Sequence, residues 1–168
     1  VRRHVRAMVR LRDRKIVRDA VLMGELERVT SRAGVHRTIR LTMTDAIRSP
    51  IALGRGEICL PSCVMAQLTP EQREAMLAHE LAHLQRNDPH WLIAFNVVEA
   101  LFILQPLNRI ARRRFQHASE QLCDEWAILH MRAPLALAQC LREVAHWLRA
   151  DRAPLPYHGM AEASSPLL

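Results

Sequence analysis

The five residues His79-Glu80-Leu81-Ala82-His83 decide the fold of this 168-residue chain. On a helix, side chains four positions apart lie on the same face, so the two imidazoles can reach one ion. Zinc commonly binds histidine, and it lowers the pKa of a bound water from about 15.7 to about 7, so that a neighbouring glutamate can take the proton. The motif predicts a zinc site at His79 and His83, with Glu80 as the catalytic base and a third protein ligand elsewhere.

Local signals predict that a helix carries this motif over residues 70–86. Thr69 is a suitable N-cap, Pro70 suits the first helical position, and Gln72 would complete a capping box. Apolar residues recur on one side of the segment, and we expect them to be buried: Met76, Leu77, Leu81 and Leu84. The two histidines should therefore project from a packed element.

Glu120 is the expected third ligand. Glu120 and Asp124 are four residues apart, so on a helix their carboxylates share a face. We expect Glu120 to bind zinc and Asp124 to support a ligating histidine through the distal N–H of its ring. Two alternatives remain open at this point: the carboxylates pair with arginines on a solvated helix face, or His117, three residues before Glu120, is the ligand instead.

Motifs on both sides of the two histidines add a second kind of evidence. In chain order they are SPIALG at 49–54, EICLP at 57–61, LTPEQ at 68–72, HELAHLQRND at 79–88, QPL at 105–107, RRR at 112–114 and EQLCDE at 120–125. With these motifs, residues 38–131 resemble the BlaR/MecR-type membrane-embedded antirepressor zinc metallopeptidases.

The resemblance implies the same site by correspondence of motifs. The histidine ligands fall on His79 and His83, the base on Glu80, the third ligand on Glu120 and the supporting aspartate on Asp124. It also implies a zinc domain on the cytoplasmic face of the inner membrane, which cleaves a transcriptional repressor or the protein itself. The chain is therefore expected to be a soluble fragment of a membrane protein, with membrane lipids or flanking transmembrane helices as its neighbours.

The composition is that of one domain with an aliphatic core. Hydrophobic residues make up 49% of the chain and aromatic residues only 4%. The four cysteines form no CxxC pair, which indicates free thiols in a reducing compartment, and Cys123 is not expected to bind metal.

The net charge of +7 is concentrated near the N-terminus, where eight basic residues among the first 18 face a single aspartate. We interpret residues 1–34 as a basic juxtamembrane helix that rests on anionic headgroups. A plain solvated face is the alternative. No nucleic acid is expected as a partner, because no DNA-binding or RNA-binding motif accompanies the charge.

The remaining elements follow from periodicity and turn residues. The zinc metallopeptidase domain is expected over 35–152 and a flexible tail over 153–168. A small sheet should span 38–60, with Gly54-Arg55-Gly56 as a hairpin turn, and helices should cover 89–105, 107–131 and 134–150. Asp88 is the expected cap of the helix over 89–105.

The segment WLIAFNVVEALFIL at 91–104 is the most apolar of the chain. Its 14 residues span about 21 Å as a helix, too short for a hydrocarbon core of about 30 Å. We expect it to be a buried helix, in which Glu99 needs a partner such as an arginine of the following helix. Contact with the bilayer is the alternative.

The stretch Pro50, Ile51, Ala52 and Leu53 resembles the edge strand that holds an extended substrate in metallopeptidases. Strand addition would bind a protein or peptide through its main chain. The sequence therefore predicts an α+β, gluzincin-like domain, mostly helical, that acts as a zinc endopeptidase in a regulatory pathway. The alternatives are a membrane-associated quality-control metalloprotease, a non-catalytic signalling module stapled by zinc, and a basic nucleic-acid-binding domain.

Overall fold

The computed structural model describes residues 11–102, 105 and 107–150. The strands are β1 (Lys15–Ile16), β2 (Arg40–Thr44), β3 (Ile51–Leu53) and β4 (Glu57–Pro61), and the helices are α2 (Ala20–Arg32), α3 (Val64–Gln67), α4 (Pro70–Gln85), α5 (Asp88–Leu101), α6 (Leu107–Met131) and α7 (Pro134–Ala150). The expected α+β class, mostly helical with a small sheet, is confirmed. Among the described residues, no helix is both long and apolar enough to cross a membrane.

The sheet has the order β1-β2-β4-β3, which leaves β3 at one edge. β2 and β4 are parallel, whereas β3 is antiparallel to β4 with Ala52 opposite Ile58. Arg55 and Gly56 join β3 to β4 with φ values of 66° and 73°, a left-handed pair typical of a tight hairpin turn. The predicted hairpin turn is therefore confirmed.

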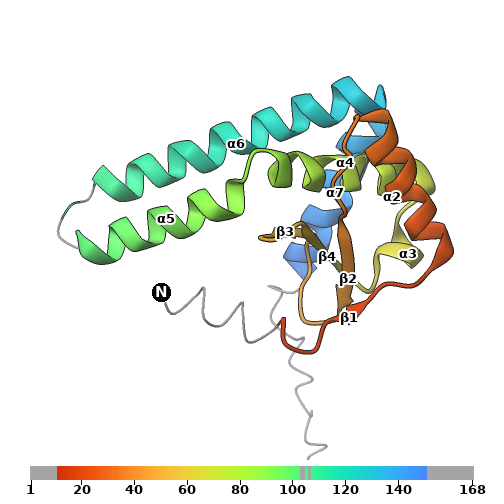
Figure 1. Ribbon diagram of the computed structural model, residues 1–168, viewed down its shortest axis with the longest axis horizontal. Coiled ribbons are helices and arrows are strands. Elements are labelled where there is room, and N and C mark those ends of the chain that lie inside the picture. The colour runs from red at the N-terminus through yellow and green to blue at the C-terminus, as the bar shows by residue number, and fades with distance from the viewer. Residues whose placement is uncertain (1–10, 103–104, 106, 151–168) are drawn as a thin grey trace, which may run out of the picture.

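Helix α4 is the central element, and it contacts α2, α5, α6, α7 and strands β3 and β4 (Figure 1). The predicted capping box is present: the Gln72 N–H donates to Thr69 Oγ1 at 3.4 Å, and Gln72 Oε1 accepts from the Thr69 N–H at 3.0 Å. The apolar residues expected to be buried are buried: Met76, Leu77, Leu81 and Leu84. The motif helix is thus fixed both at its start and along its length.

Helices α5 and α6 form a long antiparallel pair that extends away from the sheet (Figure 1). The expectation that α5 is buried is wrong, because Trp91, Val97 and Leu101 are exposed. The polar part of that expectation is confirmed, since Arg112 of α6 lies 3.1 Å from the Glu99 carboxylate. We call α5 together with the first half of α6 the helical hairpin.

The N-terminal segment differs from the single basic helix expected over residues 1–34. Residues 15 and 16 form β1, which pairs with β2, and Asp19 then caps α2 by accepting from the N–H groups of Val21 and Leu22. Leu11 and Val17 are buried. Residues 11–32 therefore belong to the packed domain, because long-range pairing and burial outweigh the local charge pattern. Residues 1–10 and the expected tail at 153–168 lie outside the described residues.

A buried ion pair joins α2 to α4. Arg73 donates to both carboxylate oxygens of Glu25, with distances of 2.9 Å from Nε to Oε2 and 2.6 Å from Nη2 to Oε1, and both residues are buried. Removing one partner of such a pair leaves a desolvated charge unmatched. The pair therefore makes the packing of α2 on α4 sensitive to either residue.

We predict that Glu25→Gln lowers the free energy of unfolding by about 3 kcal/mol, because Arg73 keeps its charge without a counter-charge. Glu74→Gln is the matched control, since Glu74 pairs with the half-exposed Arg28 and Arg32 of the same helix α2. It should cost less than about 1 kcal/mol. Urea unfolding followed by circular dichroism measures both values, and equal losses would contradict the prediction.

Candidate metal centre

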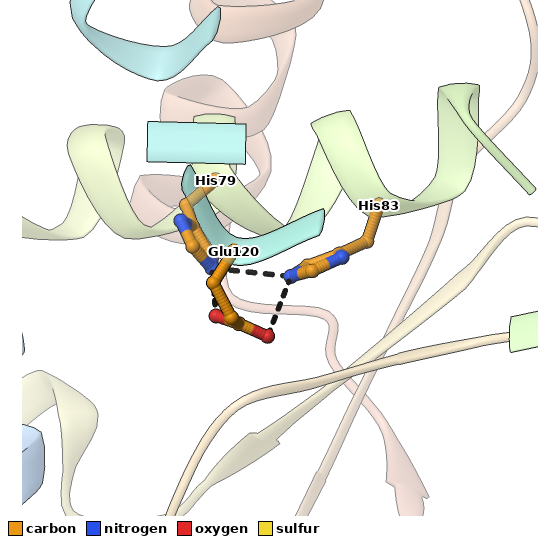
Figure 2. Close-up of side chains that lie close together, drawn as sticks. All are labelled: His79, His83 and Glu120. Atoms are coloured by element: carbon orange, nitrogen blue, oxygen red, sulfur yellow. Dashed lines mark hydrogen bonds and ion pairs between the residues drawn. The ribbon is translucent and has the colours of Figure 1, made fainter. Parts of the chain in front are cut away.

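Two histidines of α4 and one glutamate of α6 converge on one point (Figure 2). The Nε2 atoms of His79 and His83 are 3.2 Å apart. Glu120 places Oε2 3.5 Å from His79 Nε2 and Oε1 3.7 Å from His83 Nε2. Ligands at about 2.0–2.2 Å from a tetrahedral zinc ion would be about 3.3–3.6 Å from one another. The donor atoms therefore fit a single ion of this kind.

Carboxylates lie behind both imidazoles. Asp88 Oδ2 is 2.9 Å from Nδ1 of His83, and Asp124 Oδ1 is 2.8 Å from Nδ1 of His79, although the latter contact is not aligned as a hydrogen bond. A carboxylate at Nδ1 favours the proton on that nitrogen and leaves Nε2 as the electron-pair donor. Both rings thus turn their Nε2 atoms towards Glu120.

The electrostatic surroundings favour positive charge at this point. Burial tends to lower the pKa of His79, but the contact with Glu120 and the charges of Glu80 and Asp124 outweigh it and raise the pKa. The contact with His79, against the effect of burial, lowers the pKa of Glu120. A site that prefers a cationic imidazole and an ionised carboxylate is also suited to a cation.

Asp88 has a role that the sequence reasoning missed. The expectation that Asp88 caps α5 is wrong: Asn87 is the N-cap, with φ 57° and no capping hydrogen bond from its side chain. Burial raises the pKa of Asp88, but hydrogen bonds from Ser119 and His83 and the charge of Arg86 outweigh it and hold the pKa below its usual value. The sequence did contain a hint of this role. Asp88 lies five residues after His83 and directly after an asparagine, a residue type that tolerates the left-handed conformation seen at Asn87.

Glu80 is buried next to the converging donors. Burial raises its pKa above the usual value, despite the opposing effects of His79, His83 and a backbone hydrogen bond from Ala52. A carboxylate that accepts a proton and gives it up again near neutral pH works best with a raised pKa. The environment of Glu80 therefore suits proton transfer.

A cleft of about 320 Å³ passes over these side chains. Of the four residues predicted to bind substrate, Pro50, Ile51 and Ala52 line the cleft, and Leu53 does not. Much of the apolar lining comes from α7, with Leu137, Cys140, Leu141 and Val144. The volume and lining are those of a ligand site with a few polar groups on an apolar background.

The two remaining candidate ligands lie elsewhere. His117 is exposed and is not part of the group formed by His79, His83 and Glu120. Cys123 lies behind His83, with Sγ 3.3 Å from Nδ1, and burial raises the pKa of its thiol to about 12. The thiol therefore contacts the ring nitrogen that Asp88 already occupies, on the far side from Glu120.

Comparison with known proteins adds the family of the chain. A fold with a small sheet and a helix that presents HExxH beside a downstream glutamate defines a metallopeptidase-like domain. The model of the BlaR1 peptidase M56 family matches residues 2–167, so the chain belongs to this family. Membership of this metallopeptidase family implies a metal cofactor and supports a regulatory peptidase class.

One curated relative is the regulatory protein BlaR1 of Staphylococcus aureus. It is 27% identical over 94 residues, which are 55% of this chain and 16% of that protein. The chain thus matches only a small part of that relative's length.

We predict that Glu120→Gln strongly lowers zinc content and that Asp88→Asn weakens zinc binding by about 10- to 100-fold, because the ring of His83 loses its charged partner. His117→Ala is the matched control on the same helix and should bind zinc like the unaltered protein. Elemental mass spectrometry after identical dialysis gives the zinc per chain, and chelator competition gives the affinity. Zinc content unchanged in Glu120→Gln would place the third ligand elsewhere.

Proposed function

We propose that this chain is the catalytic domain of a zinc-dependent endopeptidase. The observation that carries the proposal is the convergence of His79 Nε2, His83 Nε2 and the Glu120 carboxylate, with the buried Glu80 beside them, in one cleft. A purely structural zinc site would have no need of a buried carboxylate next to the donors. The position of Glu80 therefore favours catalysis over a zinc-stapled signalling module.

His79, His83 and Glu120 would hold the ion, with Asp124 and Asp88 behind the two histidines. Bound zinc supplies a Lewis acid that polarises the scissile carbonyl and lowers the pKa of a bound water. Glu80 takes the proton of the attacking water and delivers it to the leaving amine, a double task for which its raised pKa is suited. The backbone N–H of Ala52 faces Glu80 and favours its ionised form, against the effect of burial on its pKa.

The substrate would bind along β3. β3 is an edge strand, so no strand of the described residues pairs with its outer main-chain groups. Ala52 directs its N–H towards Glu80, which means that this free edge faces the site. An extended peptide added to β3 would run along the cleft past the zinc ligands, with successive side chains on opposite faces of the extended sheet.

The biological role we propose is regulatory, on the cytoplasmic face of the inner membrane. The support is membership of the BlaR1 peptidase M56 family and the similarity to a protein named as regulatory. The substrate would be a transcriptional repressor or the protein itself. Incubation with a panel of unrelated unfolded proteins tests this role, since a quality-control protease would cut most of them and a regulatory one few or none.

We predict that Glu80→Gln lowers peptide hydrolysis by at least about 100-fold, because general-base catalysis of this kind contributes about 10²–10⁴-fold. The variant should keep the zinc content of the unaltered protein, since Glu80 is not a ligand. Fluorogenic peptides and elemental mass spectrometry provide the two readouts. If Glu80→Gln kept its activity, Glu80 would not be the catalytic base.

We predict that Ala52→Pro reduces cleavage at least about tenfold without loss of zinc, because proline removes the N–H that faces the site and disrupts strand addition. Ala52→Ser, which keeps the N–H, should cleave like the unaltered protein. The same peptide assay and zinc measurement apply to both variants. Equal cleavage by the two variants would exclude β3 as the substrate strand.

A further inference from the structure

In the helical hairpin, polar side chains of α5 face α6 and apolar side chains face outwards, which is the reverse of a helical hairpin exposed to water. Between Trp91 and Phe102, helix α5 has only two polar residues, and both point towards α6. Asn96 accepts a hydrogen bond from Arg112 at 3.2 Å, and Glu99 lies 3.1 Å from the same guanidinium. Both polar side chains of this stretch of α5 therefore contact α6 and do not lie on the outer face of the hairpin.

The outer surface of the hairpin is correspondingly apolar. Leu101 is 73% exposed, Trp91 56% and Phe102 55%. Of the 18 large apolar residues that are exposed in the described part of the chain, eight lie between positions 91 and 110: Trp91, Ile93, Val97, Val98, Leu101, Phe102, Leu107 and Ile110. Such a concentration indicates a surface that contacts something other than water.

Positive charge adjoins this apolar surface. Residues 89–119 contain four arginines and one glutamate, and that glutamate is neutralised by Arg112 within the hairpin. The other three arginines, at positions 109, 113 and 114, are exposed on α6: Arg109 lies between Leu107 and Ile110, and Arg113 and Arg114 follow about one turn after Ile110. Their long side chains can follow an apolar surface while the guanidinium groups reach phosphates.

We propose that the helical hairpin is a membrane-surface anchor, with the outer face of α5 buried among the acyl chains and the α6 arginines bound to anionic lipid headgroups. The combination of a continuous apolar face and adjoining basic residues is typical of helices that lie in the interface. The 14 residues of α5 reach only about 21 Å, less than the hydrocarbon thickness, so insertion is shallow and does not span the bilayer. The proposal takes up the membrane location proposed above, and it does not depend on peptidase activity.

Flotation of the full chain with phospholipid vesicles tests the anchor. Vesicles of phosphatidylglycerol and phosphatidylcholine in equal parts should bind the unaltered protein, and Leu101→Glu should weaken binding by about tenfold or more, since it places a charge among acyl chains. Leu129→Glu is the matched control: Leu129 on the distal part of α6 is also 73% exposed, and the charge change is the same. This control should bind nearly as well as the unaltered protein.

Two further measurements separate lipid from other occupants. Replacing Arg113 and Arg114 with glutamine should weaken binding to the anionic vesicles several-fold and have little effect on phosphatidylcholine alone. Light scattering without lipid reports self-association. If the unaltered protein forms a dimer but does not bind vesicles, and Leu101→Glu is a monomer, the apolar surface contacts a second copy of the chain. This result would overturn the proposal.

The remaining outcomes are equally decisive. No vesicle binding by the unaltered protein, or equal losses for Leu101→Glu and Leu129→Glu, would also overturn the anchor. An unchanged thermal unfolding midpoint in Leu101→Glu verifies that this variant is folded. Glu80→Gln should bind vesicles like the unaltered protein, so failure of the anchor and failure of the peptidase assignment are distinguished.

Discussion

The arrangement of the candidate site depends on the contacts between two imidazoles and two carboxylates from other helices. An imidazole can present either nitrogen to an ion, and Asp88 and Asp124 decide the matter by occupying the Nδ1 side of His83 and His79. The rings come from α4, the aspartates from α5 and α6. The donor geometry is therefore a property of three packed helices and not of the HExxH motif alone.

The packing of α4 explains how one helix can be both core and site. Its apolar residues contact α2, α6, α7 and the sheet, while His79, Glu80 and His83 face the cleft. Because every other side of α4 is covered, the three polar side chains have few alternative conformations. The buried pair of Arg73 and Glu25 adds a charged link on the α2 side. Rigid support of this kind keeps the distance between the ligand nitrogens short.

Much of this could be predicted from the sequence, because the deciding rules are local. Thr69, Pro70 and Gln72 specify the start of α4, and Arg55 with Gly56 gives the hairpin turn. The position of Asp88 had only an indirect sequence signal, the asparagine before it, because it depends on how α5 leaves the left-handed Asn87 and packs beside α4. The two-residue strand β1 forms only through pairing with β2, which no local pattern reveals.

The exposure of α5 could not be read from the sequence for a different reason. A helix that is apolar on most sides indicates an apolar environment, but the pattern does not say whether protein or lipid provides it. Only the structure shows that Asn96 and Glu99 face Arg112 and that Leu101 faces outwards. The match to the relative BlaR1 spans only 16% of that protein, so it does not say what covers α5.

Asp88 is both the first residue of α5 and the hydrogen-bond partner of His83, and Ser119, which also donates to Asp88, is the neighbour of Glu120. The start of the helical hairpin at Asp88 is thus in contact with one candidate ligand, His83, and with the neighbour of another, Glu120. If the hairpin pivots at Asn87 by about ten degrees, a tip about 21 Å away moves by nearly 4 Å, while Asp88 moves by only a fraction of an ångström. Such a displacement of the tip would therefore reach the ring of His83 only as a small change, because Asp88 is the partner of that ring.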